Sequence, residues 1–102
     1  MLQSTIEKIL PQLEPLCDLL CVDKHHRNAH FGERDGEPAG TVIVHIGEIN
    51  MGTEYQMCFN VWGQLTKIAE VHWSMHGDIY HIDATNFVLG STMERKNDDI
   101  YS

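Results

Sequence analysis

The chain has 102 residues, 42% of them apolar, and its fifteen acidic and seven basic residues give a net charge of −8. This length suits a single domain, residues 1–102, and excludes a core plus a separate catalytic domain. The shortage of lysine and arginine excludes nucleic acid as a direct ligand, because phosphate binding needs them. No apolar stretch is long enough to cross a bilayer, and the first residues lack the pattern of a secretory signal. Three cysteines without a disulfide-type spacing agree with a cytoplasmic protein.

Residues 2–22 carry apolar side chains at three- and four-residue steps, which is typical of a helix with one buried face. This face consists of Ile6, Ile9, Leu10, Leu13, Leu16, Cys17 and Leu20. Ser4 or Thr5 is the expected N-cap. Pro11 and Pro15 interrupt the pattern, because an interior proline removes a hydrogen bond. We therefore expect either a short helix to about Leu10 and a second over 12–21, or one kinked helix.

Residues 23–40 show no sustained periodicity and contain glycines and a proline, so they are predicted to form a long loop. Loops of this length in small domains are functional or mobile. Glu33, Asp35 and Glu37 place three carboxylates on this loop. Such a loop is suited to entering a basic cleft of a partner, and an ordinary solvated loop is the alternative interpretation.

From Thr41 onward the apolar period changes to two, which predicts β-strands at 41–49, 54–62, 66–75 and 79–85. A loop at 50–53, a loop at 63–65 and a turn at 77–78 allow an antiparallel meander in which apolar residues face apolar residues. In this register Val44 lies opposite Phe59, Met57 opposite Val71, and Trp73 opposite Ile82. One face of the sheet then collects Val42, Val44, Ile46, Tyr55, Met57, Phe59, Val61, Val71, Trp73, Met75, Tyr80 and Ile82.

The predicted fold class is therefore α+β, with the N-terminal helical segment on one face of a four-stranded antiparallel β-meander. A less regular run at 87–89 would add a fifth strand. The sheet region spans 41–90, and residues 91–102 are expected to form a mobile tail.

The same register predicts an opposite face rich in histidine, carboxylate and amide groups. It consists of Ile43, His45, Gln56, Cys58, Asn60, Trp62, Ile68, Glu70, His72, Ser74, His81, Asp83 and Thr85. Three interpretations remain open: a solvated outer face, a face that binds a partner or a second copy, and a chemical site. Trp62 is the residue there most typical of an interface.

A chemical site on this face would use one of two arrangements. His45, Cys58, Glu70 and His72 are the residue types that hold a metal, with His45, Cys58 and His72 as the first candidates. Asp83 opposite His72 would instead orient an imidazole for acid–base work. A flat sheet face, however, offers neither a pocket nor oxyanion donors. We therefore expect no enzyme activity and no metal or other cofactor.

These observations favour a small acidic cytoplasmic inhibitor, of the bacterial immunity or antitoxin type, that blocks a basic partner such as a nuclease toxin. The expected partner-binding residues are Glu33, Asp35, Glu37, Trp62, Glu70, His72 and Asp83. The loop and the polar sheet face are alternative positions for the interface, and a homodimer through the sheet face is compatible with the pattern. The alternative functions are a metal-binding or His/Asp acid–base protein and, because of the seven histidines, a pH-responsive adaptor.

Overall fold

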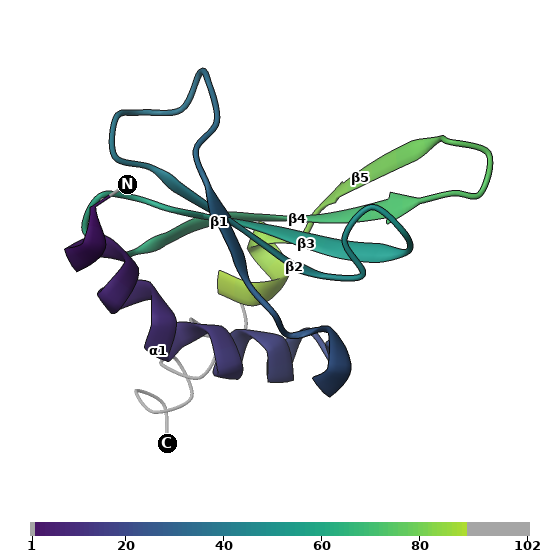
Figure 1. Cartoon of the computed structure of the whole chain (residues 1–102), viewed down its shortest axis with the longest axis horizontal. Coiled ribbons are helices and arrows are strands. Elements are labelled where there is room, and N and C mark those ends of the chain that lie inside the picture. Colours follow the sequence, from purple (N-terminus) through teal and green to yellow (C-terminus); the bar gives the residue numbers. More distant parts are fainter. Residues whose placement is uncertain (1, 90–102) are drawn as a thin grey trace, which may run out of the picture.

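A computed structural model describes residues 2–89 (Figure 1). The elements are α1 (Gln3–Leu19), the 3₁₀ turn η1 (Lys24–His26), β1 (His30–Gly32), β2 (Val42–Gly47), β3 (Thr53–Phe59), β4 (Leu65–Trp73) and β5 (Ile79–Asp83). The strands pair antiparallel in the order β1-β2-β3-β4-β5. This arrangement confirms the predicted α+β class and the meander. The expected tail at 91–102 lies outside the described residues.

The fifth strand is not where the sequence placed it. Residues 87–89 belong to a helical turn at 85–89, whereas β1 lies inside the segment predicted as a loop. β1 is only three residues long, but Phe31 pairs with Val44 of β2 and packs against the core. One partly buried ring in so short a strand leaves no period-two signal, which is why the prediction missed it.

α1 runs unbroken through Pro11 and Pro15, so the alternative of two separate helices is wrong. Both prolines lie on the exposed side of α1, where water replaces the lost main-chain partners. The side chains that hold the helix against the sheet recur at four-residue steps and are Thr5, Ile9, Leu13 and Cys17. Packing of this face stabilises the helix despite its prolines.

Neither Ser4 nor Thr5 is the N-cap, because the cap position is Leu2, which makes no side-chain cap hydrogen bond. Thr5 instead donates from Oγ1 to the carbonyl of Val61 at 2.8 Å. These contacts and the buried face hold α1 beneath the sheet, on the same side as the 85–89 turn (Figure 1). Within the described residues, no helix is both long and apolar enough to cross a membrane.

The pairing of β2 with β3 keeps the predicted faces but shifts the register by two residues. Val44 lies opposite Met57, where the sequence analysis placed Phe59. Because side chains alternate with period two, this shift leaves Val42, Val44 and Ile46 on the helix side.

The predicted pairing of β3 with β4 is wrong in a way that exchanges the two faces of β4. A β-bulge between Cys58 and Phe59 inserts one extra residue, Thr66, into β4. Thr66 is tied back to the bulge by a hydrogen bond from its Oγ1 to the carbonyl of Cys58 at 3.1 Å. The turn also lies at 61–63, two residues earlier than expected. The bulge and the earlier turn together place Ile68, rather than Val71, opposite Met57 on the helix side.

The predicted pairing of β4 with β5 is also wrong. The turn is one residue longer than expected, since the N–H of Ser74 donates to the carbonyl of Asp78. Trp73 therefore lies opposite Ile79 rather than Ile82, and His72 lies opposite Tyr80. The two errors together leave Glu70 and His72 on the helix side, and His81 and Asp83 on the opposite side of the sheet.

Candidate functional site

The structure separates the residues of both predicted chemical sites. His45 and Cys58 lie on the face away from α1, whereas Glu70 and His72 lie on the helix side. His72 and Asp83 are likewise on opposite faces, so Asp83 does not orient the His72 imidazole. Among residues 2–89, no three histidine, cysteine or carboxylate side chains are close enough together to hold a metal ion.

The predicted acidic loop is partly tied down. Glu37 is paired with Lys67 at 2.6 Å, and Arg34 donates to Oε1 of Gln56 at 2.6 Å. Glu33 and Asp35 are exposed. Trp62 is 67% exposed in the β3–β4 turn. The structure thus spreads the seven predicted partner-binding residues over the loop, a turn and both faces of the sheet.

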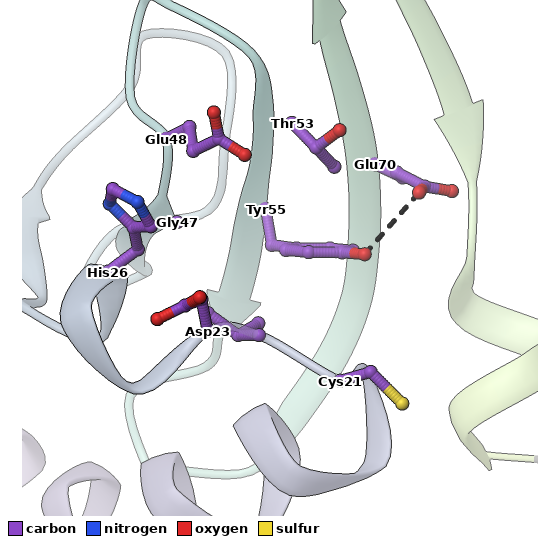
Figure 2. Close-up of a pocket in the computed structure, with 9 residues that line it drawn as sticks. Cys21, Asp23, His26, Gly47, Glu48, Thr53, Tyr55 and Glu70 are labelled. Carbon is purple, nitrogen blue, oxygen red and sulfur yellow. Dashed lines mark hydrogen bonds between the residues drawn. The ribbon is translucent and has the colours of Figure 1, made fainter.

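A different group of acidic residues meets at the C-terminal end of α1, on the helix side of the sheet. Figure 2 shows a pocket of about 290 Å³ there, with the carboxylates of Asp23, Glu48 and Glu70 around it. The complete lining is Cys21, Val22, Asp23, His26, Gly47, Glu48, Thr53, Tyr55 and Glu70. Among residues 2–89, no lysine or arginine lines the pocket, and its described lining is strongly acidic.

The chain reversal after α1 positions one wall of this pocket. The N–H of Val22 donates to the carbonyl of Cys17 at 2.9 Å, and that of Cys21 to Asp18 at 3.2 Å. This is the Schellman arrangement, which needs a left-handed residue after the helix. Cys21 takes that conformation with φ of 58°. The reversal places Asp23 beside the sheet instead of continuing the helix away from it.

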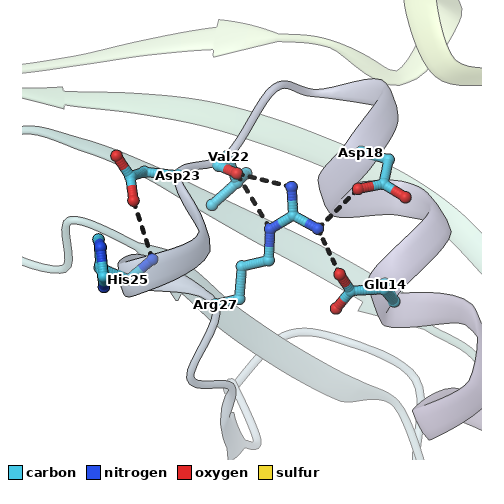
Figure 3. Close-up of polar contacts among 6 residues, drawn as sticks. All are labelled: Glu14, Asp18, Val22, Asp23, His25 and Arg27. Atoms are coloured by element: carbon cyan, nitrogen blue, oxygen red, sulfur yellow. Dashed lines mark hydrogen bonds and ion pairs between the residues drawn. The ribbon is translucent and has the colours of Figure 1, made fainter.

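Arg27 fixes the segment that carries Asp23 (Figure 3). Its Nη1 lies 2.6 Å from Glu14 and 2.7 Å from Asp18, both on α1. Its Nε and Nη2 donate to the carbonyl of Val22 at 3.0 and 2.8 Å. Arg27 therefore balances part of the charge of Glu14 and Asp18, and connects η1 to α1.

The carboxylate of Asp23 accepts a hydrogen bond from the N–H of His25 at 2.8 Å. This bond lowers the pKa of the Asp23 carboxyl, so the group is ionised at neutral pH. On the opposite wall, Tyr55 donates from its hydroxyl to Oε1 of Glu70 at 3.3 Å. Burial, followed by the charge of Glu70, raises the pKa of the Tyr55 hydroxyl. The tyrosine therefore stays a neutral hydrogen-bond donor at the floor of an acidic pocket.

An apolar hollow of about 350 Å³ continues from the acidic pocket along α1. The two cavities share Cys21, Tyr55 and Glu70. The remaining lining of the apolar hollow is Leu19, Leu20, Ile82, Asp83, Ala84 and Phe87. The combined groove is thus acidic at the β2–β3 turn and apolar towards β5.

Sequence reasoning included Glu70 in the interface but missed Asp23 and Glu48. Asp23 precedes a Lys-His-His run at the start of an expected loop, and Glu48 lies at the end of an expected strand. Nothing in the sequence indicates that Asp23 and Glu48 lie close to each other. Their meeting with Glu70 depends on the bulge in β4, which brings Glu70 to the helix side.

Comparison with protein-family models, curated proteins and solved structures gives no match to this chain. The functional argument therefore rests on the geometry of the groove.

Proposed function

We propose that this protein is a cytoplasmic inhibitor of the immunity or antitoxin type, and that it binds a basic protein partner through the acidic pocket. The observation that carries the proposal is the meeting of Asp23, Glu48 and Glu70 around one pocket, to whose lining the described part of the chain contributes no lysine or arginine. A negatively lined cleft with apolar walls concentrates the electric field and attracts cationic groups.

The charge pattern of the rest of the molecule supports this position for the interface. Glu14 and Asp18 are paired with Arg27, and Glu37 is paired with Lys67. These pairs reduce the field near the loop and along α1. Among residues 2–89 no lysine or arginine is paired with a pocket carboxylate, and Glu70 lies 3.5 Å from the His72 imidazole, so the pocket is a site to which a basic partner is attracted.

The apolar hollow beside the pocket specifies the partner further. A lysine or arginine side chain of the partner would enter between the carboxylates, and a neighbouring large apolar residue would pack against Leu20 and Ile82. Interface hot spots are enriched in arginine and in large aromatic side chains that fill well-packed pockets.

A nuclease or another nucleic-acid-processing enzyme fits these requirements, because such enzymes expose a cationic cleft to bind phosphate. Occupation of that cleft by an acidic protein would exclude the nucleic acid and stop the reaction. The proposal replaces the 33–37 loop by the pocket as the main interface.

The test uses two triple variants that change the net charge equally. Asp23→Asn/Glu48→Gln/Glu70→Gln alters the pocket and Glu33→Gln/Asp35→Asn/Glu37→Gln alters the loop, and each removes three negative charges, from −8 to −5. Asparagine caps a helical turn as well as aspartate does, so η1 is preserved.

The partner is captured from the native host with the tagged full chain, purified, and measured in surface plasmon resonance and in an assay of nucleic-acid hydrolysis. We expect a basic partner whose association rate falls roughly tenfold or more with the pocket variant, and much less with the loop variant. The same rate should fall steeply with salt for the unaltered protein. Equal losses for both variants, or a larger loss for the loop variant, would overturn the proposed interface, and a partner without net positive charge would overturn the function.

A further inference from the structure

β5 is exposed along its whole length although it carries large apolar side chains. All five residues are exposed, with Ile79 at 46%, Tyr80 at 59% and Ile82 at 50%. The β4–β5 hairpin extends beyond the end of α1, so the helix does not cover it (Figure 1). A group of exposed apolar side chains on a regular element marks an interaction surface.

β5 is also the edge of the sheet. Its hydrogen-bonded neighbour among residues 2–89 is β4 alone. The N–H of Ser74 donates to the carbonyl of Asp78, and that of Ala84 donates to the carbonyl of Ile68. In an antiparallel pair, alternate residues direct their main-chain groups towards the same neighbour. Tyr80 and Ile82 therefore bond towards β4.

It follows that Ile79, His81 and Asp83 direct their N–H and C=O groups to the open edge. Natural proteins commonly protect such an edge with lysine, proline or a bulge. β5 contains no lysine or proline, and its pairing with β4 is regular throughout. Within residues 2–89 this edge has no strand paired with it, so it can accept another strand.

We propose that a second copy of this chain pairs with this edge, with the two β5 strands antiparallel and centred on His81. In this register Ile79 lies opposite Asp83 of the second copy, and each outward pair exchanges two main-chain hydrogen bonds. Tyr80 lies opposite Ile82 as a pair without mutual hydrogen bonds, whose side chains approach more closely. An aromatic residue beside a β-branched one is a favourable cross-strand pair.

The edge is self-complementary in this register, and this selects a second copy as the occupant. All three outward-directed residues of both strands find partners, and the Tyr80–Ile82 contact occurs twice by symmetry. A shift by two residues in either direction leaves an outward residue of each strand unpaired. The two-fold pairing closes at the dimer and extends the sheet across both copies, with both α1 helices on the same side.

The dimer contact shares Ile82 with the apolar hollow but includes none of Asp23, Glu48 and Glu70, so the pocket variant tests the inhibitor function without altering the dimer edge. An edge of this length buries little area, so we expect a reversible dimer. Sedimentation equilibrium of the full chain from micromolar to millimolar concentration should show the average mass rising from 11.7 kDa towards twice that value. A mass that stays at 11.7 kDa over this range would overturn the proposal.

His81→Pro tests the edge itself. Proline removes an N–H that points to the open edge, and the hydrogen bonds between β5 and β4 remain. We expect a folded monomer at every concentration, with folding checked by circular dichroism. The matched control is Leu10→Lys, which removes a side chain on α1 that is 50% exposed. This variant should dimerise like the unaltered chain; monomeric Leu10→Lys or dimeric His81→Pro would place the interface elsewhere.

Two further variants test the register without proline. Tyr80→Lys and Ile82→Glu should each be monomeric alone, because each places an unpaired charge opposite an apolar residue. Mixed in equal amounts, they should form a heterodimer in which the introduced lysine faces the introduced glutamate. Failure of the mixture to associate would overturn the register centred on His81.

Discussion

Glu54 is 1% exposed and lies on the face of the sheet away from α1. Its carboxylate is bonded to Nδ1 of His45 at 2.7 Å, Nε1 of Trp73 at 3.0 Å and Nε2 of Gln56 at 3.0 Å. The N–H of Asn50 adds a fourth bond at 3.2 Å. Burial alone would raise the pKa of Glu54, but the four hydrogen bonds outweigh burial and the pKa lies below its ordinary value. The ionised carboxylate therefore joins β2, β3 and β4 at one buried point.

Replacement Glu54→Gln should lower the free energy of unfolding by about 2–4 kcal/mol at neutral pH. The glutamine amide keeps the shape of the glutamate side chain but loses its negative charge. Its NH₂ group also points at hydrogen-bond donors, which then lose their acceptor. Urea unfolding followed by circular dichroism measures the loss. The control is Glu7→Gln on the exposed side of α1, which should change stability little. An equal effect of the two variants would show that the buried network does not stabilise the fold.

The same residue predicts how acid affects stability. Because the folded-state pKa of Glu54 lies below the unfolded-state value, its contribution is fully present above the ordinary carboxyl pKa of 4.5. It is lost as the pH falls through the folded-state pKa. The difference in unfolding free energy between the unaltered chain and Glu54→Gln should therefore shrink as the pH falls from 7 to about 3. A difference that stays constant over this range would contradict the assignment.

At the scale of elements, Gly63 marks the closest approach of the β3–β4 turn to α1. Its φ is +77°, and a Cβ built there would lie 2.7 Å from Cβ of Lys8. Gln12 also donates to the carbonyl of Gly63 at 2.7 Å. Gly63→Ala should destabilise the fold by about 1–3 kcal/mol, through backbone strain and displacement of α1. The control is Gly32→Ala in β1, where a Cβ meets open space; it should leave the melting temperature unchanged or slightly raised. Equal losses in melting temperature for Gly63→Ala and Gly32→Ala would contradict the close contact at Gly63.

The C-terminal reversal of α1 predicts a gain in stability. Cys21 adopts a left-handed conformation that is strained for any residue with a Cβ. Cys21→Gly should therefore raise the free energy of unfolding by about 0.5–1 kcal/mol. Cys21→Ala is the matched control, since it removes the thiol but keeps the strain. Equal stability of the two variants in urea titrations would show that the thiol, rather than the backbone, accounts for any change.

The β3–β4 and β4–β5 turns, where two of the three register errors begin, follow one pattern. Asn60 accepts hydrogen bonds through Oδ1 from the N–H groups of Trp62 and Gln64, and Gly63 completes the turn with a positive φ. Ser74 does the same through Oγ for His76 and Asp78, with Gly77 in the corresponding position. A short polar residue with glycine three positions later was therefore the signal for these turns, and the sequence analysis did not use it.

Apolar periodicity predicted α1, the four strands β2 to β5 and the faces of β2 and β3 correctly, because burial enforces alternation along a strand. It did not predict the extra residue at Thr66, since a bulge leaves the alternation intact on each side and only exchanges the faces. This extra residue places Glu70 on the helix side of the sheet, near Asp23, instead of on the opposite side with Asp83. The acidic pocket therefore could not be derived from the spacing of the residues alone.

At the scale of the whole molecule, the net charge of −8 acts against the compact state. Salt should therefore raise the melting temperature as ionic strength increases from about 10 to 150 mM, where the screening length falls from about 30 to 8 Å. The buried Glu54 network is little screened at these concentrations, so it should not reverse the trend. Differential scanning calorimetry at neutral pH measures the effect.

The double variant Glu7→Lys/Asp35→Lys replaces two exposed acidic residues and changes the net charge by two units at each position, from −8 to −4. The salt-dependent rise should be clearly smaller for this variant, because less repulsion remains to be screened. A melting temperature that falls with salt in both proteins would mean that attractive ion pairs, such as Arg27 with Glu14 and Asp18, outweigh the overall repulsion.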